Sequence, residues 1–277
     1  MSRRDPRKYP IILPFGKGPR LKDLGLSLVY TFYNNEEFRL NTQINIWESY
    51  SISVKDKLNI VIVDDCARVP IHTLLTRKID AKVEFYRIKE DLKWNTPGAL
   101  NLGILNAPTD WVLWLDSDCF LKNDDMENLM ENLSPTFGWI YYFTRKRIYK
   151  DRTVDYRYHP CASLCHKESF KTTGGFDEDF VGQRSGGYGV FDKDLELRWV
   201  KYTSQARGYL QDVPVYEMMP DVTGSSIQIR DMNRVMNDNR SCGYFDRNVK
   251  LMYDKNNGIK LRNRKLLNFE WEKHDLR

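Results

Sequence analysis

Two pairs of aspartates stand directly after apolar runs of this sequence, in positions where carboxylates could bind a metal ion or a nucleotide. Asp116 and Asp118 follow Trp-Val-Leu-Trp-Leu, and Asp64 and Asp65 follow Asn-Ile-Val-Ile-Val. Carboxylates at the end of a buried strand repel one another and are costly to remove from water. A hard divalent cation that bridges Asp116 and Asp118 to a diphosphate would relieve both costs. This pair therefore indicates a site for a hard divalent cation.

The Asp-x-Asp tripeptide itself carries little weight. A chain with 25 aspartates in 277 residues contains roughly two such tripeptides by chance, and this chain has three. The other two lie at 177–179 and 192–194. Only the preceding apolar run distinguishes Asp116 and Asp118, and the structural alternative for them is a strand-end turn with solvated aspartates.

The second pair has a different use open to it. Asp64 or Asp65 could accept a hydrogen bond from a nucleobase N–H at the edge of a sheet. The alternative is an aspartate that caps the following turn through its own backbone. Tyr33 ends an earlier apolar run and could stack on the base, although an aromatic side chain at a strand end is more often simply packed.

Strands and helices alternate over the first 120 residues and would position these groups. Continuous apolar runs predict buried strands, and apolar residues near a 3.6-residue period predict helices. We expect strands at 26–34, 57–65, 81–88 and 111–118, with helices at about 36–50, 71–78 and 97–107 between them. This rhythm predicts an α/β fold with a mostly parallel, doubly wound sheet. Ligands of such sheets bind outside the carboxyl ends of the strands, where the polar groups converge.

The second half of the chain has a different pattern. Residues 139–149 alternate as in a half-exposed strand, a Gly-rich stretch follows at 173–189, and 192–200 predict a helix. Residues 1–25 read as an N-terminal arm. Residues 221–277 are polar and weakly helical, and we expect them to pack against the domain as an extension.

The composition excludes several classes of protein. Hydrophobic residues make up 41% of the chain, enough for a sizeable core, and the net charge of +5 is not concentrated in a basic block, so no nucleic-acid partner is expected. No apolar run approaches the roughly 18 residues that span a bilayer, which leaves any membrane association peripheral. Five cysteines without a Cys-x-x-Cys pair argue against a disulfide framework. Pro10 and Pro14 interrupt the first apolar stretch, so it makes a poor signal peptide, and we expect a cytoplasmic protein.

Two further features have alternative interpretations. His159, Cys161, Cys165 and His166 lie within eight residues and could bind zinc, but zinc sites usually use two separated pairs, which favours local packing. The basic segment at 260–265 is more consistent with a solvated face than with an RNA site.

Five segments in order carry a specific resemblance. They are LSLVYTFYNNEEF, NIVIVDDCA, PGALNLGILNAPTDWVLWLDSD, TGGFDEDF and GGYGVFDKDLELR. Together they resemble the GT-A-fold glycosyltransferases of glycosyltransferase family 2 over roughly residues 26–200. The resemblance implies a Rossmann-like GT-A domain at 26–220, with a nucleotide-binding half at 26–120 and an acceptor half at 121–220.

The resemblance also assigns candidate residues for binding the donor. Thr31 and Tyr33 match first-strand nucleotide contacts, and Asp65 matches the carboxylate that binds the base. Lys93 lies near the place of a basic residue that helps to hold the nucleotide. In the Asp-x-Asp motif, Asp118 matches the direct metal ligand, and Asp116 lies nearer the ribose and the metal shell.

The family's catalytic base lies in a G-x-E-D-x-D-L-x-x-R context. Residues 189–198 match it, and Asp192 falls on the base position. Inverting transfer needs a carboxylate that takes the proton of the acceptor hydroxyl while a metal stabilises the diphosphate leaving group. The alternative is that Asp192 is the N-cap of the helix, and the two roles are compatible. The Gly-rich loops would shape the acceptor pocket, with Gly175, Asp177, Gly187 and Tyr188 as candidates.

This sequence departs from the family pattern at three positions. Phe191 replaces the acidic neighbour of the base, and Leu100 stands where an arginine often precedes Asn101. Glu217 stands where many relatives present a histidine to the metal, and it could serve as an oxygen ligand instead.

The expectation from these features is a metal-dependent inverting glycosyltransferase with Asp192 as general base and Mn²⁺ or Mg²⁺ as cofactor. Its donor would be a nucleotide-sugar, with a UDP-sugar favoured, and its acceptor a glycan or another hydroxyl compound. The alternative is a non-catalytic protein that has kept the fold and binds a nucleotide-sugar or a glycan.

Overall fold

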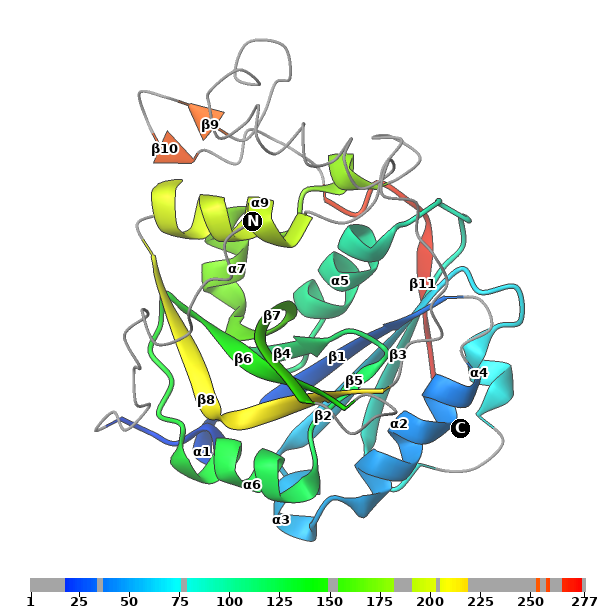
Figure 1. The fold of residues 1–277 in the computed structure, drawn as a ribbon. Helices are drawn as coiled ribbons and strands as arrows, with labels where there is room; N and C mark the ends of the chain where they lie inside the picture. The colour runs from blue at the N-terminus through cyan, green and yellow to red at the C-terminus, as the bar shows by residue number, and fades with distance from the viewer. Residues whose placement is uncertain are drawn as a thin grey trace.

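The computed structural model describes most of the first 218 residues and three short stretches near the C-terminus (Figure 1). The described residues are 18–33, 37–75, 79–148, 154–181, 191–202, 205–218, 253–254, 258–259 and 266–275. Most of the expected N-terminal arm and much of the expected extension at 221–277 lie outside them.

A nine-stranded sheet in the order β11-β3-β2-β1-β4-β7-β6-β8-β5 forms the centre of the molecule. Among these strands β1, β2, β3, β4, β6 and β8 run in one direction, and β5, β7 and β11 run in the other. The bounds are β1 Leu26–Phe32, β2 Leu58–Asp65, β3 Lys82–Ile88, β4 Trp111–Leu115, β5 Cys119–Phe120, β6 Trp139–Ile148, β7 Val154–His166, β8 Ala206–Glu217 and β11 Trp271–His274. A separate two-stranded sheet joins β9 (Tyr253–Asp254) to β10 (Gly258–Ile259). The predicted mostly parallel α/β fold is confirmed.

Helices cover both faces of the sheet. The bounds are α1 Leu21–Leu24, α2 Glu37–Ser49, α3 Ile52–Lys55, α4 Ile71–Leu74, α5 Thr96–Leu105, α6 Asn123–Asn132, α7 Lys167–Thr173 and α9 Phe191–Leu197. A short 3₁₀ turn at Glu178–Phe180 (η2) precedes α9, and a π-helical turn at Arg198–Tyr202 follows it. In Figure 1, α5, α7 and α9 lie on one side of the sheet and α2, α3 and α6 on the other.

Two hydrophobic clusters form because successive strand residues point to opposite faces. In β1, Leu28 and Tyr30 belong to the cluster beneath α2 and α6, and Val29 belongs to the cluster beneath α5 and α7. Gly103 lets α5 lie close to the sheet, since a Cβ there would come within 2.5 Å of Val29 Cγ1. The continuous apolar runs of the sequence therefore reflect strands that are buried on both faces.

Two strands differ from the sequence expectation. The strand expected at 111–118 ends at Leu115, because residues 116–118 turn the chain back into β5. The strand at 139–149 was expected to be half-exposed, which is wrong for its first half: residues 140–143 are all buried. The physical reason is that β6 lies between β7 and β8, with helices on both faces.

The described residues near the C-terminus return to the sheet. Strand β11 pairs antiparallel with β3 at the sheet edge. Before it, the backbone N–H groups of Leu267 and Asn268 donate to the buried carboxylate of Glu178. The described part of 221–277 contains short strands and no helix, whereas weak helical character was expected. None of the helices in the described ranges has the length and apolar character needed to cross a membrane.

Candidate active site

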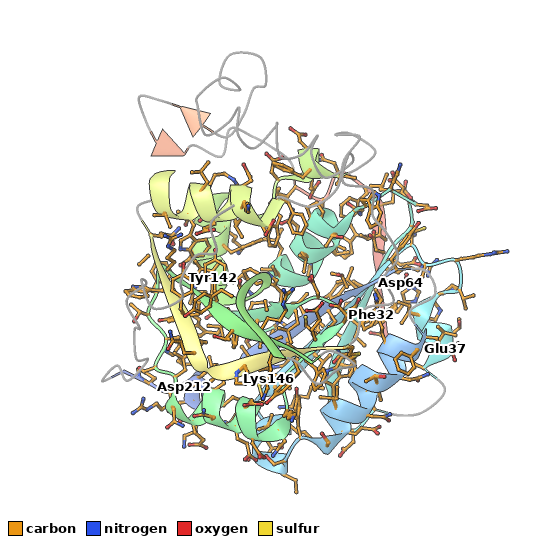
Figure 2. All side chains as sticks on the ribbon, viewed as in Figure 1. Phe32, Glu37, Asp64, Tyr142, Lys146 and Asp212 are labelled. Atoms are coloured by element: carbon orange, nitrogen blue, oxygen red, sulfur yellow. The ribbon has the colours of Figure 1, made fainter. Side chains whose placement is uncertain are left out.

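The candidate site lies along what we term the carboxyl edge, the C-terminal ends of β1, β2, β4 and β8. These strands run in the same direction, so their C-terminal ends meet at one side of the sheet. Figure 2 labels Phe32 and Asp64, the last and the next-to-last residues of β1 and β2. The edge brings together Asp65, the turn at 116–118 and Glu217 from distant parts of the sequence.

Asp64 has the structural role that the sequence left open. Its side chain is fully buried, and it accepts hydrogen bonds from the backbone N–H groups of Ala67 at 2.7 Å and Ile71 at 3.0 Å. Arg87 on β3 forms an ion pair with the same carboxylate and also donates to the carbonyl of Ala67. Asp64 therefore fixes the loop between β2 and α4.

Asp65 points to different partners. It is 6% exposed, and its Oδ1 accepts a hydrogen bond from Asn95 Nδ2 at 3.0 Å. Asn95 is fully buried directly before α5, so the start of that helix orients the Asp65 carboxylate. Sequence reasoning missed Asn95; its position before Thr-Pro-Gly at a helix start is the signal that could have found it.

The other predicted nucleotide contacts lie around Asp65 in the fold. Thr31 is partly buried near the end of β1, and Tyr33 follows that strand with 38% of its surface exposed. The Tyr33 hydroxyl donates to Asp91 at 2.9 Å, which ties it to the loop between β3 and α5. Lys93 is exposed on the same loop. The roles of Thr31, Tyr33 and Lys93 in holding a nucleotide stay predictions.

A buried glutamine holds the turn that carries Asp116 and Asp118. Gln43 of α2 is fully buried, and its Nε2 donates to the carbonyls of Ser117 at 3.2 Å and Cys119 at 2.7 Å. The N–H of Cys119 donates to the carbonyl of Asp116 at 2.8 Å. Sequence reasoning missed Gln43, although a polar residue on the apolar side of a helix is a usable signal. Helix α2 thus determines where the two aspartates lie.

Asp118 lies beside a second carboxylate. Strand β5 pairs with β8 so that Cys119 is opposite Glu217, and the N–H of Met218 donates to the carbonyl of Asp118 at 2.7 Å. Burial and the nearby charge of Glu217 raise the pKa of Asp118, and Arg39 of α2 opposes that shift. A carboxyl group whose ionisation is opposed by burial and by a neighbouring carboxylate suits a divalent cation.

The ligands available here fit a metal ion held jointly by protein and substrate. Asp118 and Glu217 offer carboxylate oxygens, which Mg²⁺ and Mn²⁺ prefer. Within the described parts of the chain, no group of three or more histidine, cysteine, aspartate or glutamate side chains is arranged to hold a metal ion. A diphosphate and water are oxygen ligands that could complete such a site.

Asp192 lies in the first turn of α9. It is the second residue of the helix rather than its N-cap, and its side chain is partly buried. Burial raises the pKa of Asp192, while the backbone N–H groups of Asp192 and Lys193 act in the opposite direction. A raised pKa makes a carboxylate a better proton acceptor, which suits the predicted role of general base.

A buried ion pair fixes α9 in place. Asp194 and Arg198 are both fully buried, and Arg198 Nη2 lies 2.8 Å from Asp194 Oδ2. Arg198 Nη1 also donates to the carbonyls of Thr173 and Gly175, at 2.7 Å each. The pair links α9 to the loop after α7, so Asp194 positions the helix, whereas its neighbour Asp192 two residues earlier is the candidate base.

The predicted acceptor loops are only partly described. Gly175 adopts φ +66°, and Asp177 is buried and accepts from the N–H of Asp179 at 2.9 Å. These contacts shape the loop before α9; a role in binding an acceptor stays a prediction. Gly187 and Tyr188 lie outside the described residues.

The departures from the family pattern are accommodated in the core or by an ion pair. Leu100 is buried, and Phe191 packs edge-to-face on Phe176 with ring centroids 5.2 Å apart. Glu217 forms an ion pair with Arg145 of β6, with Arg145 Nε and Glu217 Oε2 3.1 Å apart.

The segment considered for zinc has packing and capping contacts. Cys165 is buried between β4 and β6, and His166 accepts from the N–H of Glu168 at the start of α7. Nothing is described of the side chains of His159 and Cys161.

Comparisons with known proteins agree with this architecture. The model of the family described as Glycosyl transferase family 2 matches residues 27–193, more than half of the chain. No curated protein sequence matches the chain.

Three solved structures share the fold. The mannosyltransferase PcManGT from Pyrobaculum calidifontis, in complex with GDP-Man and Mn²⁺, is 17% identical with a TM-score of 0.57, over 78% of this chain and 62% of that one. GalNAc-T7 with UDP, GalNAc and Mn²⁺ is 13% identical with a TM-score of 0.54, over 71% and 44%. S. aureus TarS in complex with UDP-GlcNAc is 12% identical with a TM-score of 0.57, over 76% and 64%. This chain spans less than two thirds of each, and the likeness confirms the predicted GT-A fold.

Proposed function

Because this chain belongs to glycosyl transferase family 2, we propose that it transfers a sugar from a nucleotide-sugar to a hydroxyl acceptor with inversion at the anomeric carbon. The observation that carries the proposal is the carboxyl edge itself. Asp65, Asp118 and Glu217 come from separate strands and turns, yet the parallel sheet brings them to one side. Such an arrangement can bind the base of a nucleotide at one end and its diphosphate at the other.

The donor would lie along the edge from β2 to β8. Asp65, oriented by Asn95, accepts a hydrogen bond from the base, Thr31, Tyr33 and Lys93 hold the nucleoside, and Asp116 lies nearer the ribose. The solved structures with this fold include complexes with GDP-Man, UDP and UDP-GlcNAc, which supports a nucleotide-sugar as the donor class. We favour a UDP-sugar.

A divalent cation belongs at the other end of the edge. Asp118, with Asp116 and Glu217 near it, would hold Mn²⁺ or Mg²⁺, and Mn²⁺ is present in two of the solved complexes. The cation supplies positive charge that stabilises the diphosphate leaving group. Gln43 and the pairing of β5 with β8 keep Asp118 in place for this task.

Asp192 performs the proton transfer in this proposal. The acceptor oxygen attacks the anomeric carbon and forms the new glycosidic bond, the bond to the diphosphate oxygen breaks, and the hydroxyl proton passes to the Asp192 carboxylate. The buried Asp194–Arg198 pair holds α9 so that this carboxylate is fixed relative to the sheet.

A thermal-shift panel tests the donor site. UDP-, GDP- and dTDP-sugars are added with and without Mn²⁺ to the wild type and to Asp118→Asn. Ligand binding raises the midpoint by mass action, so we expect a Mn²⁺-dependent shift for one nucleotide class that disappears in the variant. No shift with any nucleotide would overturn the donor assignment.

Product formation tests the role of Asp192 as the general base. Asp192→Asn should lose transfer by about 10²- to 10⁴-fold while keeping the donor shift. Full activity in this variant would show that another group takes the proton.

Two departures from the family pattern favour the non-catalytic alternative, which is the second candidate. Phe191 buries an apolar ring where relatives have an acidic residue, and Glu217 is ion-paired where many relatives have a histidine. A donor shift without any turnover of the donor, by transfer or hydrolysis, would support a binding protein.

A further inference from the structure

An arginine lies near the β4–β8 end of the carboxyl edge, where the metal ion is proposed to bind. Arg145 on β6 is opposite Val215 of β8, so Glu217, two residues further on, lies on the same face of the sheet. Arg145 Nε and Glu217 Oε2 are 3.1 Å apart, and the side chains are only 14% and 5% exposed. The pair therefore lies in a poorly solvated place, where interactions between charges are stronger than at the surface.

The same glutamate lies next to Asp118. Cys119, the residue after Asp118, is paired with Glu217, and the two carboxylates interact by charge. Glu217 thus has a cation on one side and a second anion on the other. As long as Arg145 holds it, Glu217 is a poor ligand for a metal ion, and the Arg145 charge also repels a cation that approaches Glu217.

We propose that Arg145 exchanges partners when a donor binds: its guanidinium leaves Glu217 for the donor's diphosphate, and Glu217 becomes available to the metal ion. The inference deepens the proposed function, on which it rests, by making Arg145 a second binding group for the diphosphate. A guanidinium suits this role because its planar set of N–H donors matches phosphate oxygens as well as carboxylates.

The exchange has a thermodynamic consequence. The free protein offers the metal ion a site with one carboxylate engaged by Arg145, so the metal alone should bind weakly. A diphosphate neutralises Arg145 and adds its own oxygens, so each ligand should strengthen binding of the other. By linkage the strengthening has the same factor in both directions.

The test measures Mn²⁺ affinity directly, by the electron paramagnetic resonance signal of free Mn²⁺, with and without inorganic pyrophosphate. Pyrophosphate carries the shared diphosphate group and needs no knowledge of base or sugar. We expect Arg145→Gln to bind Mn²⁺ alone about tenfold more tightly than the wild type, because a buried repelling charge is gone and Glu217 is released. The factor by which pyrophosphate strengthens Mn²⁺ binding should fall about tenfold in the same variant.

Matched variants separate this role from a structural one. Lys146, which is labelled in Figure 2, is the next residue on β6. Its ammonium lies 5.5 Å from the centroid of the Tyr216 ring. Lys146→Gln removes the same charge from the opposite face of the strand and should leave Mn²⁺ affinity within about twofold of the wild type. Arg145→Lys should restore the wild-type pattern in part. In the double variant Arg145→Gln/Glu217→Gln the tighter binding of Mn²⁺ alone should disappear.

The double variant also covers a folding failure, because it removes both members of the buried pair and leaves no unpaired charge. If Arg145→Gln does not fold, loss of pyrophosphate-linked Mn²⁺ binding in the folded double variant still supports the exchange, and its retention overturns it.

The outcomes distinguish this inference from the proposed function. If Arg145→Gln and Lys146→Gln both bind Mn²⁺ like the wild type, and UDP or pyrophosphate still strengthens that binding, the exchange is wrong while the metal site stands. If the wild type binds Mn²⁺ neither alone nor with UDP or pyrophosphate, the metal dependence of the proposed function fails, and the exchange fails with it.

Discussion

The two ends of the carboxyl edge hold their aspartates in different ways. At the β2 end, Asp64 is paired with Arg87 and accepts two backbone hydrogen bonds, and Asp65 accepts one from Asn95. At the β4–β8 end, Asp118 lies beside another carboxylate, and burial together with that neighbour raises the pKa of Asp118. At the first end, the charge of Asp64 stabilises the loop between β2 and α4. At the second end a cation would stabilise the negative charge of Asp118. In the proposed function, this contrast would separate a preformed nucleobase site from a site that is completed by a ligand.

The largest effect expected from this contrast is the loss of Asp64. Asp64→Asn leaves Arg87 without its charged partner in a buried place, and it weakens the cap of the loop before α4. Breaking a buried pair from one side typically costs about 3–5 kcal/mol, and we expect a loss of unfolding free energy of about 3 kcal/mol. Urea denaturation measures this quantity. A loss below about 1 kcal/mol would mean that the pair contributes little and that the two ends are less different than they look.

The matching change at the other end should behave differently. Asp118→Asn removes one of two repelling carboxylates, so the unfolding free energy should stay constant or rise by up to about 1 kcal/mol. The same variant should lose the Mn²⁺-dependent donor shift. If Asp118→Asn instead destabilised the protein as much as Asp64→Asn, Asp118 would be part of the framework, and the proposed metal site would need another residue.

A smaller effect is expected at Asn95. It would test whether Asp65 binds the nucleobase of the donor. Asn95→Ala removes the hydrogen bond that orients Asp65, so donor affinity should fall by about tenfold, and stability by about 1 kcal/mol. Isothermal titration with the donor found in the thermal-shift panel measures the first, and urea denaturation the second. The control for a lost hydrogen bond is Tyr86→Phe, which removes the hydroxyl bonded to Glu84 on the neighbouring strand β3 and has no proposed contact with the donor.

The main strands and the strand-end acids could be predicted because they depend on local pattern. Buried parallel strands read as continuous apolar runs, and Asp65, Asp116 and Asp118 directly follow or end such runs. The roles of Asp64 and Asp65 could not be separated from sequence, since they depend on Arg87 and Asn95, which reach them from other elements.

The groups that were missed all act through long-range contacts. Gln43 donates a hydrogen bond to the carbonyl of Cys119, 76 residues away. Arg145 forms an ion pair with Glu217 on the neighbouring strand. The two-sided burial of β6 likewise depends on its neighbours β7 and β8, which sequence order does not reveal. Periodicity describes which face of an element is apolar, but it does not say which element will cover a polar residue.

The smallest expected effect on stability concerns Asp192, which differs from its neighbour Asp194 in α9 in the same way as the two ends of the carboxyl edge differ. Burial raises the pKa of Asp192, so the folded state holds a proton on this carboxyl to higher pH than the ordinary value of 3.8, and its ionised form costs stability. That cost is present above the folded pKa and vanishes as the pH falls below 3.8. Asp192→Asn should therefore gain less than about 1 kcal/mol at pH 7, and the gain should shrink by pH 4, as urea denaturation at the two pH values would show. Asp194→Asn is the matched control: it leaves Arg198 buried without its charged partner and should lose stability at pH 7. If both variants lost stability, Asp192 would hold the helix as Asp194 does, and its availability as a general base would be in question.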